Sequence, residues 1–231
     1  MVCIKKIAAF ALFAGFVVCS GAIAQEMSIE DSYLQQSVEV MIVKEQAANN
    51  DRESKLLALE YVRQMLENGD GSEPVRAILQ DMALEGTLNK VREEGRTANN
   101  FPDIRMKAVA YLGGIKTKES ANALVKVLLI DPEPSVVAEA IHSLENIGIN
   151  DNDEIVHAIS FVFIRYDARN PNNVLALSVI NALNTFCQKT GSRNPEIYKI
   201  LNTISVSPSY TANVRNFALK KLSELSKLSV K

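Results

Sequence analysis

The chain has 231 residues and a formal net charge of −2, with 47% hydrophobic and 23% charged residues, as in an ordinary globular protein. Basic and acidic residues are mixed along the chain, and nucleic-acid binding needs a concentrated basic surface, so we exclude nucleic acid as an expected partner. Glycine and proline are sparse, which favours a helical protein.

The first 24 residues have the pattern of a secretory signal peptide. Lys5 and Lys6 form a charged start, Ile7–Val18 forms an apolar core, and residues 22–24 place alanine at both positions that a signal peptidase reads. We therefore expect cleavage after Ala24 and export to the periplasm or another extracytoplasmic space. After removal of this segment we expect no stable membrane insertion.

Two other interpretations of this segment would keep the protein on a membrane. An uncleaved anchor would use Ile7–Ala24, which is short for a bilayer that takes about 20 apolar residues to cross. A lipoprotein signal would use Cys19, although Val18 stands where that motif prefers a small residue.

Cysteine use agrees with export but leaves no internal disulfide. Cys3 and Cys19 lie in the predicted signal peptide, so the mature chain keeps only Cys187. This residue lies in an apolar helical segment, and we expect a buried, inert thiol. An intermolecular disulfide is the alternative.

The mature chain begins with a segment that we expect to form an N-terminal helix over residues 25–50. Val38, Met41 and Ile42 fall on one face of that helix, and Asp51 is a suitable N-cap for the helix that follows.

A repeated pattern then runs to the C-terminus. Apolar or small residues recur at offsets 0, 4, 8 and 11 of one segment type, and these offsets lie on one stripe of a helix. The segments are 104–115, 136–147, 175–186 and 214–225, with a weaker copy at 55–66. A small residue at offset 4, such as Ala108 or Ala140, lets a neighbouring helix approach closely.

A second helical segment follows each of the first three clear copies. These segments are Glu119–Ile130, Glu154–Tyr166 and Pro195–Ile204. Short polar breaks, many with proline, separate the helices. Residues 91–100 form an insert, and residues 72–89 are either another second helix or a degenerate repeat. No stretch alternates apolar and polar residues for long, so we expect no sheet.

Residues 102–108, 131–136 and 140–148 resemble HEAT repeats, as does Asn213-Val214-Arg215 in the last copy. The resemblance covers residues 51–231. It implies an all-α fold, a right-handed α-solenoid of about four to five HEAT-like helical hairpins. In such a solenoid the first helices line the convex face and the second helices the concave face. The third copy departs from the pattern because it lacks a basic residue after Leu175.

The sequence carries no recognisable catalytic or cofactor motif. It has no glycine-rich phosphate loop, no His-Glu-x-x-His and no serine in a Gly-x-Ser-x-Gly elbow. His142 and His157 lie on different helices and do not make a metal site by spacing. Asp151, Asp153 and Glu154 are better explained by helix capping and helix-dipole compensation than by calcium binding. We expect no cofactor and no metal.

One helical segment, Ile155–Ile164, is apolar on nearly every side. Such a helix is either buried all round or presents apolar surface to a partner. Burial inside the stack is the preferred interpretation, and a partner groove at Phe161 or Phe163 is the alternative.

The resemblance implies protein–protein recognition, so we expect a non-catalytic scaffold that binds another protein. An enzyme, or an accessory subunit in protein modification, is the second class, and it would require clustered titratable groups on the concave face. The expected partner-binding residues are those on the second helices: Lys118, Asn122, Lys126, His157, Arg165, Tyr166, Tyr198, Lys199 and Asn202. Arg165 and Tyr166 are the favoured anchors, because arginine and tyrosine are enriched among residues that dominate binding energy.

Overall fold

A computed structural model describes residues 29–228, with side chains from residue 38 to residue 227. The predicted signal peptide of residues 1–24 lies outside this range. The described chain is helical, as expected. Its helices are α1 (Ile29–Ala48), α2 (Arg52–Glu67), α3 (Glu73–Ala83), α4 (Pro102–Gly114), α5 (Lys118–Ile130), α6 (Pro134–Ile147), α7 (Glu154–Asp167), α8 (Asn173–Lys189), α9 (Pro195–Val206) and α10 (Ala212–Leu228).

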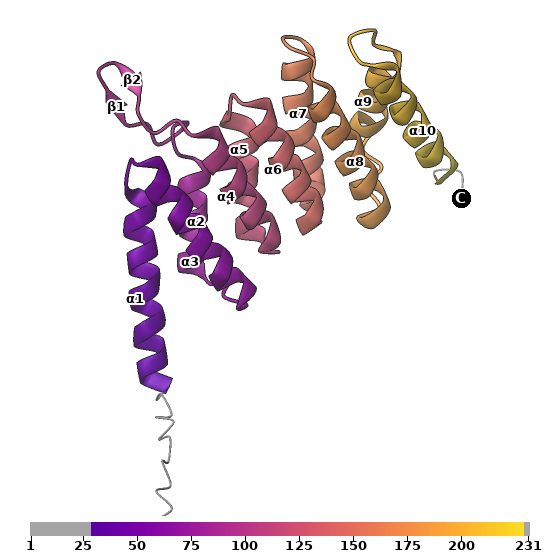
Figure 1. Cartoon of the computed structure of the whole chain (residues 1–231). Helices are drawn as coiled ribbons and strands as arrows, with labels where there is room; N and C mark the ends of the chain where they lie inside the picture. Colours follow the sequence, from indigo (N-terminus) through magenta and orange to yellow (C-terminus); the bar gives the residue numbers. More distant parts are fainter. Residues whose placement is uncertain (1–28, 229–231) are drawn as a thin grey trace, which may run out of the picture.

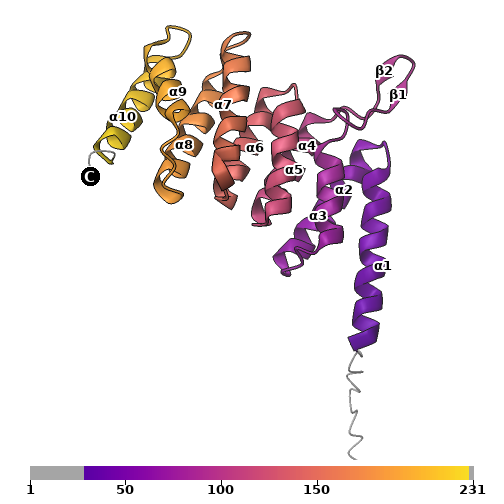
Figure 2. The same cartoon turned by 180° about the vertical axis from the view of Figure 1, so that it is seen from behind.

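The helices form two rows that run from one end of the molecule to the other (Figures 1 and 2). In the first row α2, α4, α6, α8 and α10 contact one another in that order. In the second row α3, α5, α7 and α9 do the same. Helix α1 lies against α2 and α3 at one end, and α10 closes the other end.

Local sequence signals set the helix boundaries. The side chains of Asp51 and Thr117 accept hydrogen bonds from the backbone N–H three residues later, at the starts of α2 and α5. Pro134 is the first residue of α6, where its missing N–H costs nothing. Gly148 ends the same helix in the left-handed conformation, with φ at 74°.

The residues at offsets 0, 4, 8 and 11 of the repeated sequence pattern form much of the core between the rows. Fifteen of the sixteen positions in the four clear copies are buried, and only Leu222 is partly exposed. Ala108 and Ala140, the small residues at offset 4, are fully buried. The first-row helices approach each other closely: a Cβ added at Gly113 of α4 would lie 2.6 Å from the Cβ of Ser143 on α6.

The expectation of no sheet is wrong at the insert. Strands β1 (Arg92–Glu93) and β2 (Arg96–Thr97) pair as a short antiparallel hairpin. Glu94 and Gly95 between them have φ of 48° and 80°, which is the backbone of a two-residue turn with both central residues left-handed. The turn, with glycine at its second central position, therefore produces a hairpin without any apolar alternation.

Candidate functional site

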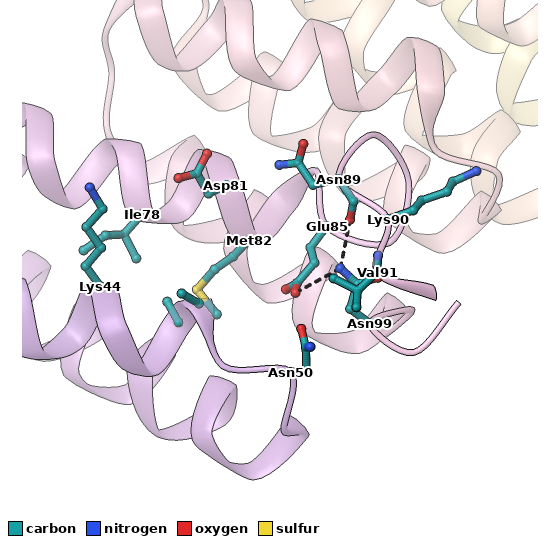
Figure 3. Close-up of a pocket in the computed structure, with 12 residues that line it drawn as sticks. Lys44, Asn50, Ile78, Asp81, Met82, Glu85, Asn89, Lys90, Val91 and Asn99 are labelled. Atoms are coloured by element: carbon teal, nitrogen blue, oxygen red, sulfur yellow. Dashed lines mark hydrogen bonds between the residues drawn. The ribbon is translucent and has the colours of Figure 1, made fainter. Parts of the chain in front are cut away.

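A cavity of about 400 Å³ lies between α1, α3 and the segment that leads to the hairpin (Figure 3). Its polar wall is already engaged by the protein. The Glu85 carboxylate pairs with Nζ of the buried Lys55 at 2.7 Å and accepts a hydrogen bond from Asn99 at 3.2 Å. Asn99 also donates to the carbonyl of Asn89 and accepts from the N–H of Val91. These bonds hold the long loop after α3 in place. We therefore assign a structural role to the polar groups that line this cavity.

A second buried ion pair joins α4 to the end of α5. Arg105 and Asp131 are each 1% exposed and meet through two hydrogen bonds, at 2.6 and 3.3 Å. Arg105 also donates to the side chain of Asn100 and to the carbonyl of Glu85. Sequence reasoning missed this pair, because 26 residues separate its members and only the folded chain brings them together.

The expected partner-binding residues all lie on α5, α7 and α9 of the second row. Six of the nine are exposed: Lys118, Asn122, Lys126, His157, Lys199 and Asn202. Helix α7 contacts both α5 and α9, and we call the exposed side chains of these three helices the second-row strip.

Three side-chain contacts set the register of the strip. Lys118 pairs with Asp151 at 2.7 Å, just before α7, and this hydrogen bond raises the pKa of the lysine. His157 near the start of α7 lies 3.0 Å from the carboxylate of Glu196 near the start of α9. Arg165 near the end of α7 donates to the carbonyl of Leu129 near the end of α5 at 2.6 Å. The three helices therefore run side by side in matched register.

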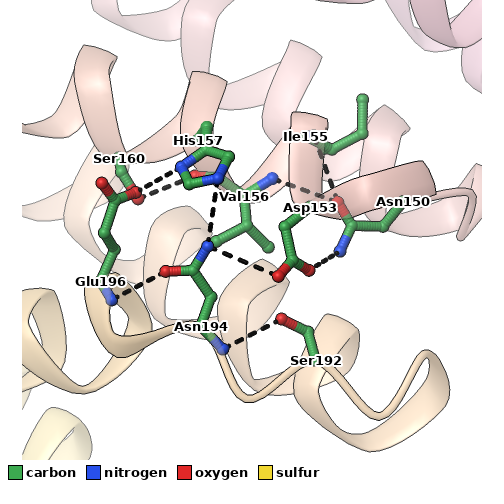
Figure 4. A network of polar contacts seen from close by, with 9 residues as sticks. All are labelled: Asn150, Asp153, Ile155, Val156, His157, Ser160, Ser192, Asn194 and Glu196. Carbon is green, nitrogen blue, oxygen red and sulfur yellow. Dashed lines mark hydrogen bonds and ion pairs between the residues drawn. The ribbon is translucent and has the colours of Figure 1, made fainter.

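A polar network surrounds His157 at the end of the strip where α7 and α9 begin (Figure 4). The two ring nitrogens of His157 contact Glu196 at 3.0 Å and the Asn194 amide at 3.4 Å. Asn194 reaches Asp153 at 3.5 Å, and Asp153 accepts a hydrogen bond from Asn150 at 2.9 Å. The network links the loop before α7 to the loop before α9.

The capping interpretation of the acidic cluster needs a correction. The side-chain oxygen of Asn150, and not an acidic group, accepts the N–H groups of Ile155 and Val156 at the start of α7. Asp153 sits at the N-cap position with φ at 59° and makes no capping bond. Its carboxylate instead serves the network described above.

Arg165 and Tyr166, the favoured anchors, are engaged within the protein. Arg165 donates to the carbonyls of Leu129 and Leu128, and its guanidinium lies 5.3 Å from the ring centre of Tyr166. The Tyr166 hydroxyl donates to the carbonyls of Asp131 and Pro132, and burial raises its pKa. Both side chains thus fasten α7 to the end of α5.

Tyr198 also turns away from the strip. It is partly buried against the core, and burial followed by the neighbouring Cys187 thiol raises its pKa. Cys187 itself is 1% exposed, which confirms the prediction of a buried thiol.

The apolar helix divides between the two interpretations given to it. Ile159, Val162 and Phe163 are buried, whereas Phe161 and Ile164 are 59% and 56% exposed on the second-row strip. Residue periodicity could not show that Phe161 and Ile164 are exposed, because the sequence of a helix that is apolar on every side does not indicate which face is uncovered.

Phe161 lies one turn after His157 and one turn before Arg165. The partner of His157 is Glu196 on α9, and the partner of Arg165 is Leu129 on α5. Lys199 lies one turn after Glu196, and Lys126 lies one turn before Leu129. Both lysines are therefore at the level of Phe161. The middle of the strip is thus an exposed aromatic side chain between two lysines.

Within residues 29–228, no group of three or more histidine, cysteine or acidic side chains is placed to hold a metal ion. None of the helices in this range is long and apolar enough to span a bilayer. The sequence matches no protein-family model, and a search among curated proteins finds no significant match.

Proposed function

We propose that the chain is an exported, non-catalytic scaffold, built as a HEAT-like α-solenoid, that binds another protein in the periplasm or cell envelope. The second-row strip, centred on Phe161, is the proposed binding surface. The observation that carries the proposal is the exposure of Phe161 and Ile164 on a helix whose other isoleucine, valine and phenylalanine side chains are buried. Large exposed apolar side chains gathered on a surface mark interaction sites more often than isolated ones.

The two rows of helices support the solenoid part of this proposal. Each helix contacts only its near neighbours along the rows, which is the contact pattern of stacked repeats. Such stacks present long, rigid surfaces, and the strip runs across three consecutive second-row helices. The resemblance of residues 51–231 to HEAT repeats also supports a solenoid, and the signal-like start of the sequence supports export.

The strip also has the composition of a binding surface. An aromatic centre surrounded by polar and charged groups is typical of interfaces whose energy is concentrated in a few residues. Lys126 and Lys199 form no ion pair among the described residues, so both remain available to a partner. The network at His157 fixes neighbouring helices, which keeps the surface rigid.

The test is site-specific photo-crosslinking in cells that express the protein naturally. A crosslinking residue at Phe161 should capture one defined partner, whereas the same residue at Asn181, exposed on first-row helix α8, should not. A Phe161→Ala variant should bind the purified partner at least tenfold more weakly, since truncating a central aromatic costs about 2 kcal/mol or more. Equal capture at Phe161 and Asn181 would contradict the proposed surface.

A further inference from the structure

The first row ends with an apolar position that no described helix covers. Val109, Ile141 and Ile180 occupy the same place in successive repeats and are each 0% exposed. In α4 the next helix of the row lies over this place, because Ser143 of α6 donates to the carbonyl of Val109 at 3.1 Å. Leu219 holds the equivalent position in α10, the last helix that the structure describes, and is 56% exposed. Within residues 29–228, this core position is therefore uncovered in α10.

The opposite end of the molecule is apolar as well. On α1, Val38, Met41 and Ile42 are 53%, 67% and 51% exposed, and their spacing places them on one helix face. A hollow of about 330 Å³ beside them is lined in part by Ile42, Tyr61 and Met65 of α1 and α2. Terminal repeats of soluble solenoids ordinarily carry polar outer faces. Here both ends depart from that rule.

The two end helices carry opposite charge. Helix α10 has four basic residues and one acidic residue, which are Arg215, Lys220, Lys221, Lys227 and Glu224. Over residues 38–48, where the structure describes its side chains, helix α1 has two acidic residues and one basic residue, which are Glu39, Glu45 and Lys44. Complementary charge on two surfaces favours their association over pairing of either surface with itself.

We propose that the molecule associates end to end, with α10 of one copy packed against α1 of a second copy. The apolar face around Met41 of the second copy would then cover Leu219, as the next helix of the row covers its equivalents Val109, Ile141 and Ile180. The contact joins two different surfaces, so it leaves a free end on each side and allows chains longer than a dimer. It uses neither Phe161 nor the rest of the second-row strip, and so it is independent of the proposed partner-binding surface.

Sedimentation equilibrium over a concentration series tests this contact. The unmodified protein should form dimers and longer species as its concentration rises, and added salt should weaken them. Met41→Asp and Leu219→Asp should each raise the dissociation constant at least tenfold, because each places a charge in an apolar contact. Val174→Asp is the matched control, since Val174 is 64% exposed at the start of α8, at neither end of the rows.

Mixing the two end variants decides the geometry. The Met41→Asp protein keeps an intact α10 and the Leu219→Asp protein keeps an intact α1, so an equimolar mixture should form dimers but nothing longer. Failure of the mixture to associate would overturn the pairing of α1 with α10. A protein that stays monomeric up to about 1 mM, or association that neither variant weakens, would overturn the proposal as a whole. Unchanged thermal unfolding of both variants shows that the fold is intact.

Discussion

Replacing Gly113 with alanine should destabilise the protein, although alanine is the better helix former. The added Cβ would lie 2.6 Å from both the Cβ and the Oγ of Ser143, and 2.9 Å from its Cα. The Cα belongs to the backbone of α6, so no side-chain rotation relieves that contact. Helices α4 and α6 must move apart, and overpacking of this kind costs about 1–3 kcal/mol.

Two opposing effects set the net change. Alanine in place of glycine inside a helix gains about 0.5–1 kcal/mol. The steric cost is at least as large as this gain, which leaves a net loss of up to about 2.5 kcal/mol. For a chain of this size each kcal/mol lowers the melting temperature by about 2–4 °C. Thermal unfolding followed by circular dichroism at 222 nm, the usual helix signal, measures such a shift.

Gly114 provides the matched control on the next residue. A Cβ added there meets nothing within 4 Å, so Gly114→Ala should leave stability unchanged or raise it by up to about 1 kcal/mol. Ser143→Ala separates the loss of the hydrogen bond to the Val109 carbonyl, about 0.5–1.5 kcal/mol, from the steric effect. If Gly113→Ala and Gly114→Ala shift the melting temperature alike, the close approach of α4 and α6 is wrong.

Three further predictions follow from buried and half-buried polar groups. Lys55→Ala should cost about 3–5 kcal/mol in chemical denaturation because it leaves the Glu85 carboxylate unpaired, whereas Arg63→Ala, which breaks exposed pairs on the same helix, should cost at most about 1 kcal/mol. Burial and then the hydrogen bond to Asp167 raise the pKa of Tyr210, so its contribution to stability is complete below about pH 10 and falls as pH rises further. Urea titrations between about pH 8 and 11 should show this fall, and Tyr210→Phe should reduce it; an equal fall in the variant would contradict the assignment. Arg165→Ala should lower stability by about 1–3 kcal/mol by releasing two carbonyls at the end of α5, and an unchanged melting temperature would return Arg165 to the list of free binding residues.

Much of the helical core could be predicted from residue spacing alone. Apolar residues at offsets 0, 4, 8 and 11 must face one direction if the segment is helical, and in three of the four copies all of them are buried. Proline and Asp51 marked helix starts for local reasons, since N-terminal capping depends on residues within one turn. Such short-range rules hold without knowledge of the fold.

The features that the sequence did not reveal depend on contacts between distant residues. Arg105 and Asp131 each lie in a segment that resembles a HEAT repeat, and only the packing of α4 beside the end of α5 pairs them. The hairpin at the insert was predictable in principle, because a glycine after Glu94 permits a left-handed turn. It was overlooked because a two-residue strand is too short to show alternation.

The candidate site shows most clearly why residue type alone misleads. Arginine and tyrosine at the end of α7 have the chemistry of binding anchors, but the carbonyl groups at the end of α5 are unpaired within their own helix and lie nearby. In a stack of helices, the C-terminal end of each second-row helix offers such carbonyls to the next helix. A donor side chain near that end therefore forms hydrogen bonds within the protein and is not free to bind a partner. The same stacking leaves one face of each second-row helix without a neighbour. An apolar residue on that face, such as Phe161, has no partner inside the protein. For this reason we propose that exposed apolar groups, rather than the charged residues at helix ends, mark the binding surface.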